Sequence, residues 1–335
     1  MRVTNKMLSN SFLNDMRTNL SNMRTLQQQM TSGKEIRKPS DDPFKAARAM
    51  QLHSDINTNK QYNENIKDTL NWLDTTDTAL GQATESMQRV RELLVSAGNA
   101  AYGSNERKAI KDEINQKVGE LSQILNTNFD GKYLFGGSRG TSKPLTTEVD
   151  AATKNTKLVY SAKAGGTLDI STAEGQKEYD MISAKLSVEI SQGVTMEYNV
   201  TANEVLKFNE NGTDYDLSEI LTKITNHLDG KNDDGTAIDS NATSKIVNED
   251  LKSVTDTISN LLRLRSEVGS KQNRMEGAKE KNEDESYNLT EILSKIEDID
   301  ITEKTMEYST MQTVYMASLQ TSAKVLQPSL IDYLR

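Results

Sequence analysis

The feature that most constrains this chain is a seven-residue apolar repeat that occurs in two long stretches far apart in the sequence. A repeat of this length is typical of α-helices that pack side by side along a buried seam. A helix of this kind has two buried positions in each seven-residue repeat. Apolar residues fill the first position, but polar residues interrupt the second in both stretches, which favours a long antiparallel bundle over a two-stranded coiled coil. The residues spaced seven apart are Ile66, Leu73, Leu80, Met87 and Leu94 in the first stretch, and Val247, Val254, Leu261, Val268 and Met275 in the second.

Both ends of the chain carry a further amphipathic stripe on an otherwise polar helical pattern. A stripe of this kind has to be buried against another part of the chain or against a neighbouring subunit, and periodicity alone leaves both options open. Near the C-terminus the stripe begins at Leu289 and continues past Pro328, which we expect to kink or begin a last turn. The principal members of the two stripes are Val3, Met7, Phe12, Met16, Leu20 and Met23 at the N-terminal end, and Leu319, Leu326, Leu330 and Leu334 at the C-terminal end.

Helix boundary signals separate the first stripe from the long repeat. Gly33 suits the position just after a helix, and Pro39 lies a few residues beyond it. Asp42 followed by Pro43 is a helix start, because an aspartate caps free N–H groups and proline at the first helical position needs no N–H. These residues predict a hinge between two helices. Ser104 is expected to cap a third helix.

The middle of the chain has a different pattern. Apolar residues alternate from Leu186 to Val200 around Ser191-Gln192-Gly193, which predicts a β-hairpin. Residues 158–160 and 168–170 are expected to form further strands, and Asp216 caps a short amphipathic helix over 217–228. The sequence therefore predicts a separate α+β insertion over 144–241 within a mainly helical body.

Composition and charge exclude several classes of function. Apolar residues make up 35% of the chain, well below the usual share of nearly half, and there is no cysteine. Residues 144–240 hold 8 Lys and 17 Asp/Glu, so their acidic surface disfavours nucleic-acid binding. No stretch approaches the roughly 18 apolar residues of a membrane-spanning helix. We expect no nucleic-acid partner and no membrane insertion.

The residues that could carry chemistry are few. Gly136-Gly137-Ser138-Arg139-Gly140 matches the nucleophile-elbow string, but a strand and a prompt helix should flank it, and His227 is the only histidine that follows. We expect the glycines to form turns. His53 has no second histidine or cysteine nearby, and the acidic runs at 232–235 and 283–285 lack calcium-loop spacing. We predict no catalytic, cofactor or metal residues and no cofactor.

Four motifs in a fixed order resemble the bacterial flagellin family. Residues 31–43 resemble its hinge signature, residues 128–137 the turn after its third helix, residues 265–274 its R-x-x-x-G-x-x-Q-N-R run, and residues 296–300 the approach to its last helix. Within the family, the strings Met1-Arg2-Val3-Thr4, Tyr133-Leu134-Phe135-Gly136-Gly137 and Ser329–Arg335 are similar to those of the hook–filament junction members. The insertion at 144–240 lies outside the resemblance.

The resemblance implies a flagellin-like fold, mainly α with an α+β insertion, built as a long antiparallel bundle plus a small β-rich domain. Its terminal stripes would be largely disordered in the monomer and become coiled-coil helices on assembly. It divides the chain into an N-terminal assembly and export segment (1–42), a helical body (43–143, with a hairpin near 130–140, and 242–288), the surface insertion (144–241) and a C-terminal assembly segment (289–335). The ten stripe residues named above would be subunit-interface residues.

The resemblance also implies partners and a location. The chain would leave the cell through the flagellar type III apparatus, bound beforehand at its C-terminal region by an export chaperone. It would lie in the extracellular flagellum in a tubular layer of its own copies, between hook-associated protein 1 and flagellin. Filament flagellin itself is an alternative, and a secreted adhesin or an enzyme carried by the insertion is a weaker one.

Overall fold

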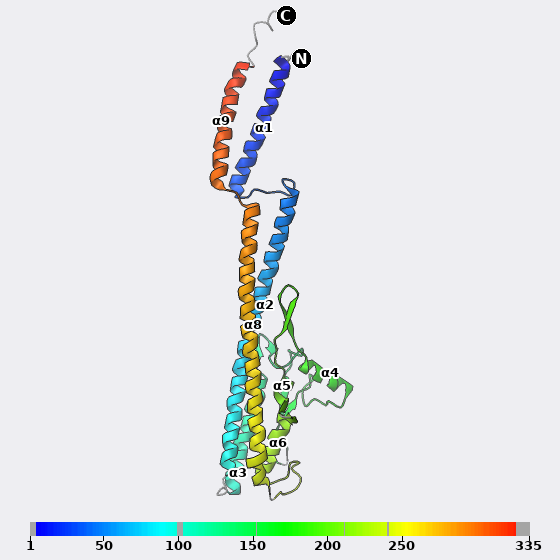
Figure 1. The fold of residues 1–335 in the computed structure, drawn as a ribbon. Coiled ribbons are helices and arrows are strands. Elements are labelled where there is room, and N and C mark those ends of the chain that lie inside the picture. The colour runs from blue at the N-terminus through cyan, green and yellow to red at the C-terminus, as the bar shows by residue number, and fades with distance from the viewer. Residues whose placement is uncertain (1–4, 99–102, 152, 211, 240, 326–335) are drawn as a thin grey trace, which may run out of the picture. The chain divides into compact units, whose positions relative to one another are not determined.

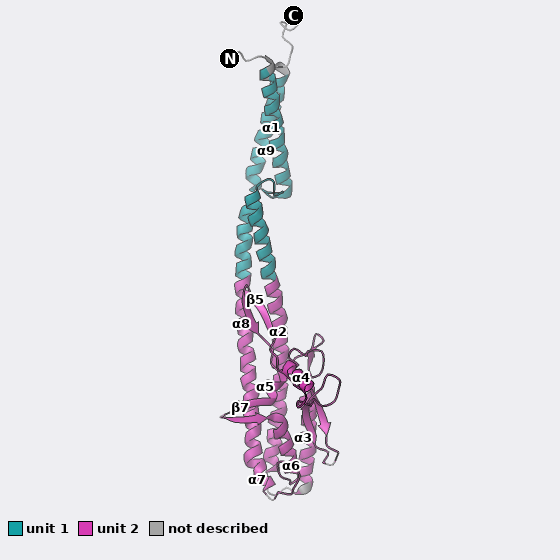
Figure 2. Ribbon diagram, turned by 90° about the vertical axis from the view of Figure 1, so that its right-hand side faces the viewer, with its two compact units in different colours: residues 1–60, 283–335 teal, residues 61–282 magenta. Residues whose placement is uncertain are grey.

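The computed structural model describes residues 5–98, 103–151, 153–210, 212–239 and 241–325. The chain divides into two compact units, residues 1–60 with 283–335 and residues 61–282, which Figure 2 distinguishes by colour. The described part is mostly helical with small β-hairpins, as the sequence predicts. The helices are α1 (Asn5–Ser32), α2 (Pro43–Ala97), α3 (Ser104–Leu125), α4 (Ala173–Ser183), α5 (Ala202–Leu206), α6 (Leu217–Leu228), α7 (Ala242–Lys245), α8 (Leu251–Glu297) and α9 (Ile301–Val325).

Within the described residues, eight short strands form four separate antiparallel hairpins, all in the unit of residues 61–282. The hairpin predicted around Gln192 is present, with a bulge between Glu189 and Ser191. The strands are β1 (Asn128–Phe129), β2 (Lys132–Tyr133), β3 (Leu145–Val149), β4 (Thr156–Tyr160), β5 (Ser187–Ser191), β6 (Val194–Glu197), β7 (Lys207–Glu210) and β8 (Thr213–Asp216).

The first apolar repeat forms the centre of the core in the unit of residues 61–282. Ile66, Leu73, Leu80, Met87 and Leu94 are each at most 1% exposed. Four of the five predicted seam residues of α8 are equally buried: Val254, Leu261, Val268 and Met275. The heptad prediction is therefore confirmed for both helices over this length.

Val247 is the exception, because it is 42% exposed while its neighbour Ile246 is fully buried. A π-helical turn, η1 (Ile246–Asp250), precedes α8 and contains one more residue per hydrogen-bonded loop than an α-helix. The extra residue rotates the apolar face by one position. The prediction that Val247 faces the core is wrong for this reason.

Polar residues of the α8 seam contact α2 directly. The Arg265 guanidinium forms two bonds to the Asp77 carboxylate, at 2.9 and 3.1 Å, and Gln272 donates to Asp74 at 2.6 Å. Asn282 occupies the next seam position after Met275 and is fully buried. Its side chain donates to the Ile190 carbonyl oxygen at 2.7 Å, which joins the β5–β6 hairpin to α8. These bonds fix the register of the helices, because a shift of one turn would break them.

The insertion packs on the helices and has no core of its own. α3 contacts β3, β4 and α6, and Leu145, Leu158 and Leu221 belong to the same buried cluster as Leu80 and Val268. Asp216 caps α6 by accepting a hydrogen bond from the Ser218 N–H, as predicted.

Two local predictions in this unit are wrong. Residues 168–170 do not form a strand, because Leu168 makes a single bond to the Tyr160 carbonyl oxygen and Asp169 then begins the turn that leads into α4. The cap of α3 is Gly103, and Ser104 is the first helical residue.

A buried polar cluster lies beside η1. His227 is 1% exposed and lies between two carboxylates, with Nδ1 2.7 Å from Asp250 Oδ2 and Nε2 3.1 Å from Asp233 Oδ1. Lys245 Nζ lies 2.7 Å from Asp233 and 3.2 Å from Asp239. Both ring nitrogens are engaged, so the cluster anchors the loop of residues 229–241 to α6 and η1.

The environment of His227 determines its protonation. Burial by itself lowers the pKa of the imidazole, but hydrogen bonds to Asp250 and Asp233 outweigh burial and raise it above the ordinary value. Bonds from Lys245 and His227 lower the pKa of Asp233 to about 2. Burial raises the pKa of Asp250. The two carboxylates therefore favour the protonated form of the imidazole more than water does.

We predict that Leu80→Ala lowers the free energy of unfolding by about 2–5 kcal/mol, because it leaves a cavity in a fully buried seam. Thermal or urea unfolding followed by Trp72 fluorescence measures the change. Val95→Ala is the matched control, since Val95 is exposed on the same helix and should change the free energy by less than about 0.5 kcal/mol. Equal effects would contradict the seam assignment.

We predict that His227→Gln destabilises the fold most at low pH. Because the folded-state pKa is raised, the histidine contributes stability that is fully present below its unfolded value of about 6.5 and is lost as pH rises through the folded value. The difference between the melting temperatures of the two proteins should be largest below about pH 6.5 and should shrink as the pH rises through the raised folded-state pKa. The control is His53→Gln, and a pH-independent difference for His227→Gln would refute the prediction.

Candidate assembly surface

The first and last helices, α1 and α9, lie side by side (Figures 1 and 2) and bury little of their apolar surface. In the described part of α1, Leu26 is the only apolar side chain that is buried. No side chain described in α9 is buried. Exposed apolar side chains on the pair include Met7, Leu13, Leu20, Ile301, Met306, Val314, Met316 and Leu319.

The predicted interface residues divide into three groups. Met7 is 61% exposed and Leu20 is 49% exposed, and Leu319 is also exposed. Phe12, Met16 and Met23 are half-buried. The other four, like Pro328, lie outside the described residues: Val3, Leu326, Leu330 and Leu334.

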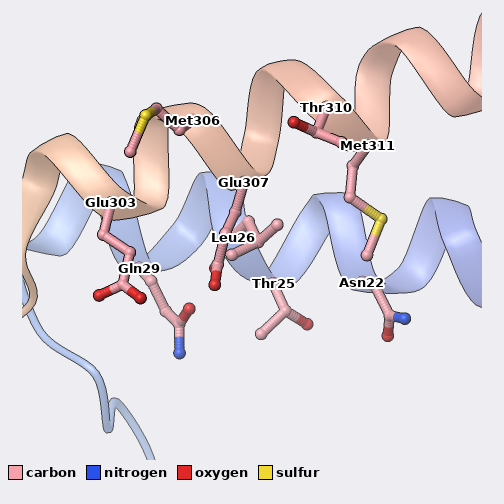
Figure 3. A pocket seen from close by; sticks show the side chains of 9 residues that line it. All are labelled: Asn22, Thr25, Leu26, Gln29, Glu303, Met306, Glu307, Thr310 and Met311. Carbon is pink, nitrogen blue, oxygen red and sulfur yellow. The ribbon is translucent and has the colours of Figure 1, made fainter.

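A groove of about 650 Å³ runs between α1 and α9. Figure 3 shows Glu307 and Met311 extending from α9 toward Leu26 and Asn22 of α1. The groove combines apolar contacts from Leu26 and Met311 with the carboxylates of Glu303 and Glu307. Such a surface can accept an amphipathic helix, since methionine adapts its shape to different partners.

The segments that connect α1 to α2 and α8 to α9 are bonded to each other. Gly33 ends α1 with a φ of +71°, the left-handed conformation that glycine adopts without strain, and its N–H donates to the Gln29 carbonyl oxygen. The Gly33 carbonyl oxygen accepts from the Ile299 N–H at 3.1 Å, and the Glu35 N–H donates to the Glu297 carbonyl oxygen at 2.5 Å.

Side chains strengthen the same crossing. Lys34 Nζ lies 2.5 Å from the Glu297 carboxylate, and His53 Nε2 lies 3.3 Å from it. Burial by itself raises the pKa of Glu297, but the bond from Lys34 and the contact with His53 lower it below its ordinary value. His53 is exposed and belongs to this ion-pair network, which the sequence did not predict.

The predicted hinge residues have local roles in the connecting loop. Asp42 accepts bonds from the N–H groups of Phe44 and Lys45, both at 3.0 Å, so the predicted cap before Pro43 is confirmed. Pro39 is the second residue of the turn closed by Asp41 N–H and the Lys38 carbonyl oxygen, a position that suits its fixed φ. Whether the loop bends as a hinge stays a prediction.

Asp300 caps α9, and this cap was not predicted from the sequence. Its carboxylate accepts from the N–H groups of Thr302 at 2.8 Å and Glu303 at 3.2 Å. The resemblance gave residues 296–300 as the approach to the last helix, and the structure agrees, because α8 ends at Glu297 and α9 begins at Ile301. The signal was present, because aspartate followed three residues later by glutamate marks a helix start.

The nucleophile-elbow string forms a turn, as expected. Ser138 donates to the Met181 carbonyl oxygen at 3.1 Å. Gly137 has a φ of +57°, and a Cβ there would collide with the carbonyl oxygens of Met181 and Ile182. Within the described ranges, no helix is long and apolar enough to cross a bilayer, and no three His, Cys, Asp or Glu side chains are placed to hold a metal ion.

Comparisons with known proteins match both ends of the chain. The family model described as the bacterial flagellin N-terminal helical region matches residues 3–139, and the corresponding model for the C-terminal helical region matches residues 251–334. The matched ranges run from the start of the chain through β2 and from the start of α8 through α9. Residues 140–250, most of which belong to the insertion, are not matched by either model.

Individual relatives are distant but span nearly the whole chain. A flagellin from Clostridium tyrobutyricum is 25% identical and the alignment covers 92% of this chain and 94% of the relative. Flagellar hook-associated protein 3 of Escherichia coli (strain K12) is 23% identical, with 87% and 86% covered. The crystal structure of flagellar hook associated protein-3 from Legionella pneumophila has a TM-score of 0.58 and 14% identity, and covers 74% of this chain and 98% of that chain. The structural likeness shows a shared fold.

We predict that amides of α1 and α9 exchange with solvent at least about a hundredfold faster than amides of α2 near Leu80, because the terminal pair buries too little apolar surface to protect them. Hydrogen–deuterium exchange on the dilute full-length chain measures the ratio, and the amides of the α2–α8 seam serve as the internal reference. Equal protection would show that the terminal pair is already stable alone.

Proposed function

Because this chain belongs to the bacterial flagellin family, whose members are structural proteins of the extracellular flagellum and not enzymes, we propose that it is the hook–filament junction subunit, the type named flagellar hook-associated protein 3. The Escherichia coli relative and the Legionella pneumophila structure carry that name and support the proposal. The short strings at both ends of the chain and at residues 133–137 favour the same member of the family.

The observation that carries the proposal is the apolar surface that α1 and α9 leave uncovered. Met306 is 63% exposed and Leu20 is 49% exposed, although both lie on helices that pack against each other. Each buried leucine or methionine contributes about 1.5–3 kcal/mol relative to an exposed one. Contacts with neighbouring subunits can recover that energy, and a lone helix pair cannot.

Coupled folding and association is the proposed mechanism. Ordering a residue costs about 1–2 kcal/mol in backbone entropy, so a terminal helix gains stability only where a neighbour covers its stripe. An end of a growing tubular assembly offers such neighbours and dilute solution does not. The chain therefore stays monomeric before export and orders its terminal helices at the assembly site.

The proposed partners follow from the junction role. Hook-associated protein 1 lies on the hook side, flagellin lies on the filament side, and copies of this chain form a layer between them. A chaperone would cover the C-terminal region before export, where the described part of α9 has no buried side chain. In this proposal the interface includes the stripe residues of α1 and α9, and the loop of residues 33–43 acts as a hinge between α1 and α2.

Filament flagellin is the second candidate. The flagellin from Clostridium tyrobutyricum aligns with 92% of this chain and supports that role. The two roles differ in whether the chain polymerises alone into long filaments, which a flagellin does and a junction protein does not. Electron microscopy of the purified chain under polymerising conditions separates them.

We predict that the chain restores filament attachment in cells that lack their junction protein and shed flagellin into the medium. Deleting residues 1–30 should abolish attachment and leave a folded, soluble chain, because the buried seam of α2 and α8 lies outside the deletion. Motility and the amount of shed flagellin measure attachment, and circular dichroism measures folding.

A double substitution, Leu20→Gln with Leu319→Gln, tests the stripes without truncation. Both side chains are exposed, so the free energy of unfolding should change by less than about 1 kcal/mol while attachment is lost. The matched control is Leu262→Gln, an exposed leucine on α8 outside the stripes, which should preserve attachment. Normal attachment by the double variant would refute the proposed interface.

A further inference from the structure

An aromatic pocket of about 560 Å³ lies between α2, the β1–β2 turn and the end of β6. Its rings come from Trp72, Phe129 and Tyr198. The Trp72 ring makes edge contacts with the other two, at centroid distances of 6.1 Å to Phe129 and 5.9 Å to Tyr198. Trp72 is 7% exposed and its N–H has no hydrogen-bond partner, so packing alone positions the ring.

Two carboxylates that line this pocket have no hydrogen-bond or ion-pair partner among the described residues. Asp68 and Asp130 line it and are exposed, and among the described residues neither forms a hydrogen bond or an ion pair through its side chain. Lys132 also lines the pocket but forms no ion pair with either carboxylate. Asp229 of the same unit, by contrast, is paired with Lys111 at 2.8 Å.

Aromatic rings and unpaired carboxylates together favour a cation. Ring faces attract an ammonium or guanidinium group by about 0.5–2 kcal/mol, and a guanidinium can also stack on a ring while it bonds a carboxylate. An anionic occupant would be repelled by the carboxylates, and a purely apolar occupant would form no bond with them. The chemistry of the pocket therefore selects a basic side chain.

The chain itself carries suitable side chains on the loop between α1 and α2. Arg37 and Lys38 are exposed, and neither side chain forms an ion pair or a hydrogen bond within the part of the chain that the structure describes. Both lie outside the helices, so they can enter a pocket without unwinding an element. Lys34 on the same loop is already paired with Glu297.

We propose that the aromatic pocket of one subunit receives Arg37 or Lys38 from the loop of a second copy of this chain. The inference rests on the proposed function only in that assembly brings copies next to each other. It assigns a role to Asp130, which lies in the turn at residues 128–133 with an exposed side chain that lines the pocket. The contact adds an electrostatic, orientation-dependent link to the apolar contacts of the stripes.

The test uses Trp72, the single tryptophan of the chain, as a reporter inside the pocket. A synthetic peptide of residues 31–44 is titrated into the full-length chain at concentrations where the chain is monomeric. We expect a saturable change in tryptophan fluorescence. The same peptide with Arg37→Gln and Lys38→Gln should bind at least about tenfold more weakly, because it retains the backbone and loses both cations.

Variants of the pocket complete the test. Asp68→Asn and Asp130→Asn should each weaken peptide binding by about tenfold, and binding should fall with added salt. Asp130 has a φ of +50°, a conformation that asparagine also tolerates, so Asp130→Asn keeps the turn. Glu64→Gln is the matched control, since Glu64 is exposed on α2 one turn before Asp68 and does not line the pocket.

No fluorescence change with the native peptide, or equal binding by the native and neutral peptides, would overturn the proposal. Binding by both Asp→Asn variants with unchanged affinity would also overturn it. The measurement needs no filament, so it is independent of the junction role. A chain that binds the peptide but fails to restore filament attachment would contradict the junction assignment and leave the pocket contact supported.

Discussion

The burial of one continuous apolar seam is the interaction on which the unit of residues 61–282 depends. Leu73, Leu80 and Met87 of α2 are removed from water together with Leu261 and Val268 of α8. The insertion adds its own apolar residues to this cluster, so its hairpins and short helices are held by the same core. Two-stranded sheets of four or five residues are only marginally stable by themselves. They persist here because the helices cover one side of them.

Polar residues along the seam give the helices a defined register. An apolar seam with a seven-residue period can shift by one repeat at little cost, whereas the bonds of Arg265 to Asp77 and of Gln272 to Asp74 hold in one alignment only. Asn59 and Asn282 replace apolar seam residues and are both buried. Each donates to a specific acceptor, Asn59 to Ser286 and Asn282 to the Ile190 carbonyl oxygen. Uniform leucine at these positions would increase burial and lose this specificity.

The terminal helices, unlike the seam, leave most of their apolar side chains partly or fully uncovered. Their stripes have the same periodicity as the seam, but α1 and α9 cover one leucine between them within the described residues. In the proposed function, contacts with neighbouring subunits cover these exposed apolar residues at the assembly site. The proposed cation contact in the aromatic pocket has a different dependence, because it is direction-specific and weakens with salt. Together, the apolar contacts of the stripes would hold neighbouring subunits together, and the cation contact in the pocket would fix their relative orientation.

The sequence alone determined the helical class, the two heptad stretches, the stripes, the Asp42 cap and the bacterial flagellin resemblance, because each depends on residues close together along the chain. The expectations failed at Val247, where a π-helical turn rotates the apolar face, and at residues 168–170, where bonds from Ser171 to the Asp169 carboxylate form a turn before α4. The tertiary structure decided which distant residues meet. His227 between Asp250 and Asp233, the crossing of Gly33 with Ile299, and the pocket of Trp72, Phe129 and Tyr198 join residues far apart in sequence. Periodicity carries information about which face of a helix is buried and none about which partner buries it.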